Sequence, residues 1–420
     1  MIGFLLVFFV VLVILRMPIA FALGIACILA ITLFGGTLLT AVPHKMVNGI
    51  DNYTFLAIPL FLLAGNLMNA GGLTERMFKF GRAMLGQIHG GLAHACVAAS
   101  ALFAWMTGSA VATVGGLGKV EVKALTENGY DRSFAAAVPA ASSILGPIIP
   151  PSIPMIIYAA MTEESIGRLF LGGILPGLLM AFSVMLLIYI LARLKNFPKD
   201  DSASWSERCL RFKKSVIPLL MPLIMLGGIN SGIFTPTEAA AVGALYALIV
   251  SLFVYRTVRF SDLPGIFAES MVTTAVITLI ISNTNILSFL LTLEQSGARL
   301  ADSMLAFTSN PLVVLVLVNI VLLILGALME AGVVLILLIL ILYPLMVVQY
   351  GIDPIHFGVL MCTNLMIGCI TPPIGVSLFV MTHVSGLKME KMIRAILPFF
   401  NSAVCYFNAH NLCAEYCFYP

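Results

Sequence analysis

The chain alternates long apolar runs with short charged or Gly/Pro-rich breaks, from residue 1 to about residue 400. A helix needs roughly 20 apolar residues to cross the hydrocarbon core of a bilayer, so this pattern predicts about ten to twelve membrane segments. Uninterrupted runs predict helices over 1–15, 18–39, 53–70, 167–192, 216–229, 239–255 and 270–293, with a last apolar segment from about 392. Four other stretches carry internal breaks: 91–125, 132–161, 311–349 and 355–384.

The composition also indicates an all-α polytopic membrane protein. Hydrophobic residues make up 60% and charged residues 10% of the 420 residues, and the mean hydropathy is +1.08. Soluble domains are about 45–50% apolar and about 25% charged, so a soluble enzyme, a nucleic-acid-binding protein and a disordered scaffold are excluded. Most of the eight cysteines lie inside apolar segments, which indicates buried side chains rather than a disulfide framework. Residues 1–15 lack a basic start and a cleavage site, which indicates a membrane helix.

The basic residues predict an orientation, because short cytoplasmic loops collect Lys and Arg. The loop 193–214 contains seven basic residues and is placed inside the cell. Helix parity then places 19 of the 22 Lys and Arg residues inside, leaves Lys45, Arg168 and Arg299 outside, and puts the N-terminus outside. This arrangement requires 91–125 and 311–349 to be re-entrant hairpins that return to their own side of the membrane.

An internal repeat links the two halves of the chain. A shift of 222 residues (351 − 129) overlays 129–176 on 351–398 without a gap. Most of the nine identities are Gly, Pro or Asp, which set backbone geometry: Gly129/Gly351, Asp131/Asp353, Gly146/Gly368, Ile148/Ile370, Pro150/Pro372, Pro151/Pro373, Ile174/Ile396, Leu175/Leu397 and Pro176/Pro398. The predicted topology gives the two copies opposite orientations, which is typical of secondary transporters built from inverted repeats.

Each copy breaks a membrane helix at a Gly/Pro cluster, 146–151 in the first copy and 368–373 in the second. Paired prolines remove successive N–H donors and free the carbonyls one turn earlier. In hydrocarbon such carbonyls must face protein or a wet cavity, where they can bind a hard cation such as Na⁺. The N-termini of the half-helices favour an anionic substrate. One isolated Pro-Pro pair would indicate a simple kink, but two related breaks favour a binding site.

A candidate hairpin tip precedes each break: 105–113, rich in small and hydroxyl residues, and 325–332. The same offset places Gly108-Ser109 opposite Glu330-Ala331. Small residues allow a tight turn inside the membrane, although they are also typical of close helix packing. Glu330 is the only charge in the second tip. Carboxylates inside the membrane are usually functional, and a satisfied structural carboxylate is the alternative.

Six motifs carry a family resemblance: 16–24 (RMPIAFALG), 59–65 (PLFLLAG), 107–112 (TGSAVA), 146–151 (GPIIPP), 235–240 (TPTEAA) and 368–375 (GCITPPIG). Together they resemble the large permease subunit of TRAP (tripartite ATP-independent periplasmic) transporters. The resemblance implies a Na⁺-coupled importer of a small organic anion, of dicarboxylate, sugar-acid or sialic-acid type, in the bacterial inner membrane. It implies no enzymatic activity and no cofactor, with Na⁺ as coupling ion. The implied partners are a small membrane subunit and a periplasmic substrate-binding protein.

The fold that the resemblance implies is elevator-like, with a transport domain of hairpins and broken helices that moves against a scaffold. The corresponding division of the chain has five parts: scaffold helices 1–90, first transport repeat 91–166, scaffold helices 167–310 with the cytoplasmic loop 193–215, second transport repeat 311–386, and a terminal helix 387–420.

Residues at the two tips and breaks are the candidate Na⁺ ligands: Gly108, Ser109, Gly146 and Pro150 around one ion, and Glu330, Gly368 and Thr371 around a second. Hydroxyl and amide residues at the tips and breaks are the candidate substrate contacts: Ser109, Ser142, Ser143, Thr363, Asn364 and Thr371. A hydroxyl at this depth often bonds its own helix instead. Asp131 and Asp353 begin the two broken helices and are predicted to be N-caps.

The end of the chain departs from the family pattern. By the repeat, Pro398 should open a long apolar helix, yet 401–412 is polar and Cys-rich. Cys405, His410, Cys413 and Cys417 match no closed zinc site, so a degenerate or frame-shifted tail is the preferred interpretation. The alternative functions are an intramembrane hydrolase, for which the chain contains no H-E-x-x-H motif, and a channel.

Overall fold

The computed structural model describes residues 1–34, 39–195, 197–199, 204–296, 304, 306, 308 and 310–412, without the side chains of 73–75, 104–106 and 408–412. All regular secondary structure in this part of the chain is helical. Seven of the described helices are long and apolar enough to cross a membrane, and six shorter apolar helices accompany them. The prediction of an all-α polytopic membrane protein is confirmed. Arg299, Cys413 and Cys417 lie outside the described residues.

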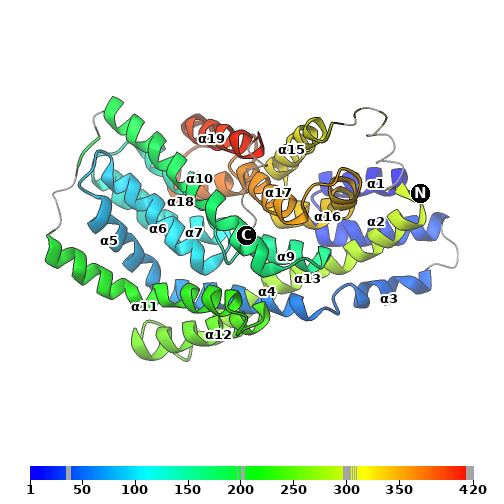
Figure 1. Cartoon of the computed structure of the whole chain (residues 1–420), viewed down its shortest axis with the longest axis horizontal. Helices are drawn as coiled ribbons and strands as arrows, with labels where there is room; N and C mark the ends of the chain where they lie inside the picture. Colours follow the sequence, from blue (N-terminus) through cyan, green and yellow to red (C-terminus); the bar gives the residue numbers. More distant parts are fainter. Residues whose placement is uncertain are drawn as a thin grey trace.

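The first three helices, α1 (Ile2–Ile14), α2 (Ile19–Phe34) and α3 (Ala41–Asn48), lie at the right-hand end of the molecule in Figure 1. The 3₁₀ turn η2 (Tyr53–Leu56) and α4 (Ala57–Ala70) then lead to α5 (Leu73–Leu85), which lies toward the left-hand end. A separate hydrophobic cluster joins α1 and α2 to the C-terminal part of a later helix, α13 (Leu263–Leu293). The hydrophobic pattern did not predict α3 or α5, because both are short and carry polar and basic residues.

The two copies of the internal repeat have the same order of elements. The first contains α6 (Gly91–Thr107), α7 (Ala110–Glu127), α8 (Arg132–Ser143), α9 (Ile153–Thr162) and α10 (Ile166–Leu194). The second contains α15 (Pro311–Leu328), α16 (Ala331–Tyr343) with the π-helical turn η4 (Pro344–Gln349), α17 (Pro354–Gly368), α18 (Val376–Ser385) and α19 (Met389–Leu412). A turn separates the first two helices of each copy, and a non-helical break separates the next two.

Equivalent residues start the two broken helices in the same way. Gly129 and Gly351 both have positive φ, +85° and +69°, a conformation that glycine adopts without steric cost. Asp131 then accepts hydrogen bonds from the N–H groups of Ser133 and Phe134. Asp353 accepts two from the equivalent residues of its own helix. Both aspartates are therefore N-caps, as predicted, and the offset of the repeat is reproduced in the backbone.

The middle of the chain supplies long helices that pack beside the repeats. They are α11 (Trp205–Asn230), α12 (Pro236–Ile249) with the π-helical turn η3 (Val250–Val254), and α13. The expectation of a loop over all of 193–215 is corrected, because α11 begins at Trp205. Ser204 caps this helix by accepting from the Glu207 N–H at 3.2 Å, and Glu207 pairs with Arg211 one turn later. Polar residues on a helix at the membrane surface were mistaken for a loop.

The terminal helix α19 continues to Leu412 despite its polar composition. Tyr406 on this helix donates a hydrogen bond to the carbonyl of Pro176 in α10 at 3.0 Å.

The two helices of the segment 311–349 are each long enough to cross a membrane, since α15 has 18 residues and α16 with η4 has 19. The re-entrant hairpin predicted for this segment stays a prediction.

Candidate functional site

A cavity of about 100 Å³ lies where the two hairpin tips and the two helix breaks meet. Its lining includes the first residues of four helices: Ala110 of α7, Ile153 of α9, Ala331 of α16 and Val376 of α18. The first N–H groups of a helix have no partner within it, and the helix dipole makes this end partly positive. Four such ends around one space create an environment that favours an anion.

The two halves of the cavity differ in how these helix ends are capped. In the first repeat, Ser109 caps α7 by accepting from the Ala112 N–H, and Ser152 caps α9 by accepting from the Met155 N–H. In the second repeat, α16 and α18 have no side-chain cap. These two helices are capped by backbone carbonyls instead: the Val333 N–H donates to the Glu330 carbonyl, and the Ser377 N–H donates to the Cys369 carbonyl.

The tip of the first hairpin packs tightly on the break of the first broken helix. Gly108 has φ +57°, and a Cβ at this position would lie 2.6 Å from the carbonyl oxygen of Pro151. No side chain fits there, so glycine is required both by the turn and by the close approach. The contact holds the start of α7 against the start of α9.

Three oxygen atoms surround the space that Gly146 leaves by having no side chain. A Cβ on Gly146 would lie 3.3 Å from the Ser109 carbonyl oxygen, the Ser143 carbonyl oxygen and Thr113 Oγ1. Pro147 cannot donate to the Ser143 carbonyl one turn earlier, so this oxygen accepts from the Gly146 N–H instead, at 3.1 Å. We call Ser109, Thr113, Ser143 and Gly146 the oxygen cluster.

The oxygen cluster fits a hard monovalent cation, because all its donors are neutral oxygens. Ser109 and Gly146 were predicted to bind such an ion, and the structure brings them together. Thr113 was missed. Its signal was the spacing of four residues from Ser109, which places both on one face of α7. The Thr113 hydroxyl donates to the Ser109 carbonyl at 2.8 Å and keeps its lone pairs for a ligand.

The second break has a different arrangement of oxygens. The equivalent glycine, Gly368, packs on Gly326 of α15, whose Cα would lie 2.7 Å from a Cβ at Gly368. The carbonyl oxygens of Cys369 and Thr371 converge instead on Gly375, which has φ +48°. The Thr371 hydroxyl bonds its own helix at the Ile367 carbonyl, 2.7 Å away. Cys369 lines the cavity, whereas the predicted ligands Gly368 and Thr371 are not among its lining residues.

Glu330 forms the tip of the second hairpin and lines the cavity. It is the N-cap residue of α16, yet its side chain makes no capping hydrogen bond, and the residue as a whole is exposed. Its carbonyl accepts from the N–H groups of Val333 and Val334, both at 3.1 Å. The backbone of Glu330 is therefore fixed at the start of α16, beside the cavity, and its side chain does not cap the helix.

The four residues expected just before the breaks do not line the cavity. Ser142 donates to Ser100 of α6 at 3.0 Å, and Ser143 bonds the Ala140 carbonyl of its own helix. Asn364 donates to the side chain of Asn319 on α15 at 2.9 Å. Thr363 is fully buried, and its hydroxyl has no partner among the described residues. The side chains of these four residues therefore favour a role in packing, and only the backbone carbonyl of Ser143 belongs to the oxygen cluster.

Pro150 is buried and does not line the cavity either. The peptide bonds Pro150-Pro151 and Pro372-Pro373 are both cis. Of the two candidate ligands in the first break, Gly146 is surrounded by oxygen atoms, whereas Pro150 is buried next to a cis peptide bond and contributes to the backbone conformation.

One wall of the cavity comes from α13, which the sequence pattern did not reveal. Thr273, Ile277 and Ile280 of this helix face the cavity. Further along α13, Asn283 donates to the Ala20 carbonyl of α2 at 2.8 Å, and Ser282 donates to the Met46 carbonyl of α3 at 2.9 Å. The helix thus connects the N-terminal helices to the cavity.

Comparisons with known proteins agree with this arrangement. Residues 6–407 match the family model "Tripartite ATP-independent periplasmic transporter, DctM component". The chain is 41% identical over 382 residues to the sialic acid TRAP transporter large permease protein SiaM of Vibrio cholerae, covering 91% of this chain and 89% of the relative. It is 42% identical over 377 residues to the C4-dicarboxylate TRAP transporter large permease protein DctM of Pseudomonas aeruginosa, covering 90% and 88%.

A solved structure shares the fold. The YdaH transporter of Alcanivorax borkumensis superposes with a TM-score of 0.60 at 15% identity, covering 90% of this chain and 88% of that one. At this identity the similarity concerns the fold alone.

Proposed function

Because the chain belongs to the DctM-component family of tripartite ATP-independent periplasmic transporters, we propose that it imports a small organic anion in symport with Na⁺. The substrate class is a C4-dicarboxylate or a sialic acid, the compounds in the names of two relatives. Both classes carry at least one carboxylate, which is the group that the cavity would bind. The membrane is the bacterial inner membrane.

The observation that carries this proposal is the meeting of four helix N-termini at one cavity that both hairpin tips line. A carboxylate placed there would receive partial positive charge from the helix ends and hydrogen bonds from first-turn N–H groups such as those of Ala331 and Val376. The described residues that line the cavity include no Lys or Arg. Capture of the anion would therefore depend on backbone groups.

The oxygen cluster supports the coupling part of the proposal. A Na⁺ ion held by Ser109, Thr113 and Ser143 would bridge the first hairpin tip and the first break. Its charge would add to the attraction of the cavity for an anion, so binding of each would favour binding of the other. Glu330 is the candidate for a second cation contact, because it places a carboxyl group in the lining of the cavity at the opposite tip.

The remaining features of the proposal follow from the family. The two tip-and-break units form a transport domain with re-entrant hairpins that moves against a scaffold containing α13 in an elevator-like cycle. A small membrane subunit completes the scaffold, and a periplasmic binding protein delivers the substrate.

The experiment is uptake into proteoliposomes that contain the chain with its small subunit, with the binding protein added outside. Labelled succinate and labelled sialic acid are offered separately, with an inward Na⁺ gradient or with K⁺ instead. We expect saturable uptake of one substrate that needs both Na⁺ and the binding protein. Uptake unchanged in K⁺ would refute the coupling, and non-saturable flux would favour the channel alternative. Hydrolysis of an added protein substrate would favour an intramembrane hydrolase.

A further inference from the structure

A second cavity, far from the hairpin tips in sequence, is lined mainly by basic residues. Its volume is about 270 Å³, and its lining consists of Gly72, Arg76, Lys79, Arg211, Lys214 and Thr257. We call it the basic pocket. The four cationic side chains come from two helices, α5 and α11, and Thr257 follows the turn η3. None of these lining residues is acidic.

The basic pocket is held together by contacts between these elements. Phe80 of α5 and Phe212 of α11 pack with ring centroids 5.9 Å apart. The Arg76 guanidinium stacks 3.9 Å above the ring of Tyr255, and the Tyr255 hydroxyl donates to the Lys214 carbonyl at 3.3 Å. These contacts hold α5, α11 and the segment after η3 together around the pocket, at whose surface Lys79 and Lys214 are exposed.

The basic pocket concentrates positive charge. Arg211 pairs with Glu207 at 3.5 Å within α11. Arg76 is engaged by an aromatic ring, which does not neutralise it. Four cationic side chains around one space raise its attraction for an anion. A phosphate group with its several acceptor oxygens matches Arg and Lys donors from different helices.

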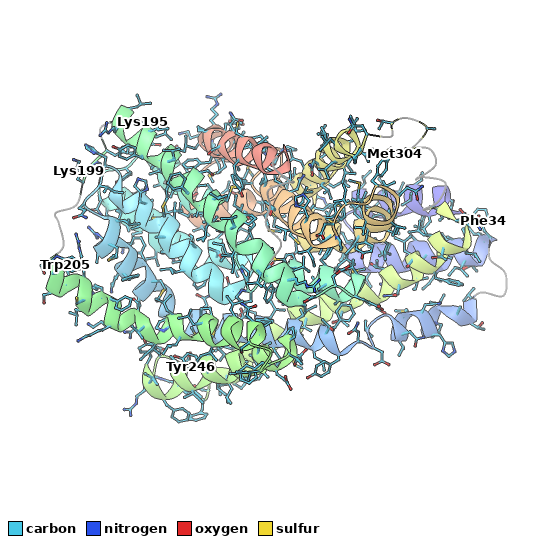
Figure 2. The ribbon with its side chains drawn as sticks, viewed as in Figure 1. Phe34, Lys195, Lys199, Trp205, Tyr246 and Met304 are labelled. Atoms are coloured by element: carbon cyan, nitrogen blue, oxygen red, sulfur yellow. The ribbon has the colours of Figure 1, made fainter. Side chains whose placement is uncertain are left out.

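The surroundings indicate that the anion comes from the membrane. Large exposed aromatic side chains occur on α11, on η3 and in the segment after η3: Trp205 at 78% exposure, Phe212, Phe253, and Phe260 at 69%. Figure 2 shows Trp205 at the outer end of α11, at the edge of the molecule. Aromatic residues mixed with Lys and Arg are typical of the bilayer interface. On α5, Met77 and Phe78 are buried beside the basic side chains, as in a helix lying along the membrane surface.

We propose that the basic pocket binds the phosphate of an anionic phospholipid headgroup and thereby links α5 to α11 at the membrane surface. The inference does not depend on the transported substrate. Phosphatidylglycerol is the suitable probe, since it carries one net negative charge and an exposed phosphodiester.

The test measures thermal stability of the detergent-purified full chain during titration with phosphatidylglycerol, phosphatidylcholine or inorganic phosphate. The variant is Lys79→Gln/Lys214→Gln, and the matched control is Lys213→Gln/Lys388→Gln, which removes the same charge from exposed residues outside the pocket. We expect phosphatidylglycerol alone to stabilise the wild type. Its apparent affinity should fall about 30-fold in the pocket variant, because each basic residue near an anionic lipid contributes a factor of about five.

Three outcomes would overturn the proposal. An equal loss of affinity in the pocket variant and the control would mean non-specific attraction. Equal stabilisation by phosphatidylcholine would mean a general effect of lipid. Stabilisation by inorganic phosphate that matches phosphatidylglycerol and is lost in the pocket variant would assign the site to a soluble anion instead. If the double variant does not fold, Lys79→Gln and Lys214→Gln are tested singly, each with an expected fall of about fivefold.

Discussion

Replacing Gly146 with alanine tests the oxygen cluster directly. The added methyl group would lie 3.3 Å from each of three oxygens, those of Ser109, Thr113 and Ser143. It would therefore occupy the space that a bound Na⁺ needs. The backbone of Gly146 has an ordinary negative φ, so alanine causes no strain from conformation. The substitution is therefore expected to block the proposed ion site without changing the backbone conformation.

The expected loss of Na⁺ affinity follows from the number of oxygen contacts that the methyl group would prevent. If each contact with oxygen contributes about 0.5–1.5 kcal/mol, as polar contacts in proteins do, losing three weakens Na⁺ binding by about 1.5–4.5 kcal/mol. Since about 1.4 kcal/mol corresponds to a factor of ten, Na⁺ affinity should fall at least about tenfold. The overpacked break should also lower the stability of the protein by about 1–3 kcal/mol.

Two assays and a control separate these effects. The first is the Na⁺ concentration for half-maximal uptake in proteoliposomes, and the second is the rise in Tm caused by NaCl compared with KCl. Gly115→Ala is the control, because a Cβ there meets nothing within 4 Å and the residue lies on the same helix as Thr113. Unchanged Na⁺ dependence in Gly146→Ala, with the Tm shift intact, would refute a cation site at the oxygen cluster.

Three further substitutions test individual groups. Thr113→Val removes a hydroxyl but keeps the shape of the side chain, so Na⁺ affinity should fall about three- to tenfold; an unchanged Na⁺ titration would exclude Thr113 as a ligand. Glu330→Gln removes the charge at the second tip, and uptake at limiting Na⁺ should fall with little change in Tm, because the carboxylate makes no capping hydrogen bond; wild-type uptake would show that this charge is not needed. Asn364→Ala should lower stability by about 1–3 kcal/mol, since it leaves the buried Asn319 side chain without its partner, while substrate affinity per folded molecule stays unchanged; a large rise in KM without a change in Tm would return Asn364 to the substrate site.

The sequence predicted those features that depend on local backbone chemistry. Asp131 and Asp353 were identified as caps because a carboxylate directly before a helix accepts hydrogen bonds from the first N–H groups of that helix. The two breaks were found because proline and glycine act on the backbone wherever they occur. The shared offset of 222 residues (351 − 129) then related one break to the other. These signals do not require knowledge of tertiary contacts.

Tertiary contacts decided what the sequence left open. Ser142 and Asn364 stood at equivalent positions of the repeat, but only the packing of α6 and α15 showed that each bonds a neighbouring helix. Thr113 became a candidate through its distance from Gly146. The cavity wall from α13 was missed because its apolar side chains look like those of any membrane helix. Hydrophobic runs also could not reveal α5, whose apolar residues cover only one face.

The different surroundings of Gly146 and Gly368 have a consequence for how the two halves can be exchanged. The backbone path is duplicated, but one copy offers hydroxyl and carbonyl oxygens where the other has two glycines in van der Waals contact. A chimaera with the second break transplanted into the first position would therefore keep the chain trace and lose the proposed Na⁺ site. The same backbone path occurs twice, and each copy surrounds it with different chemical groups.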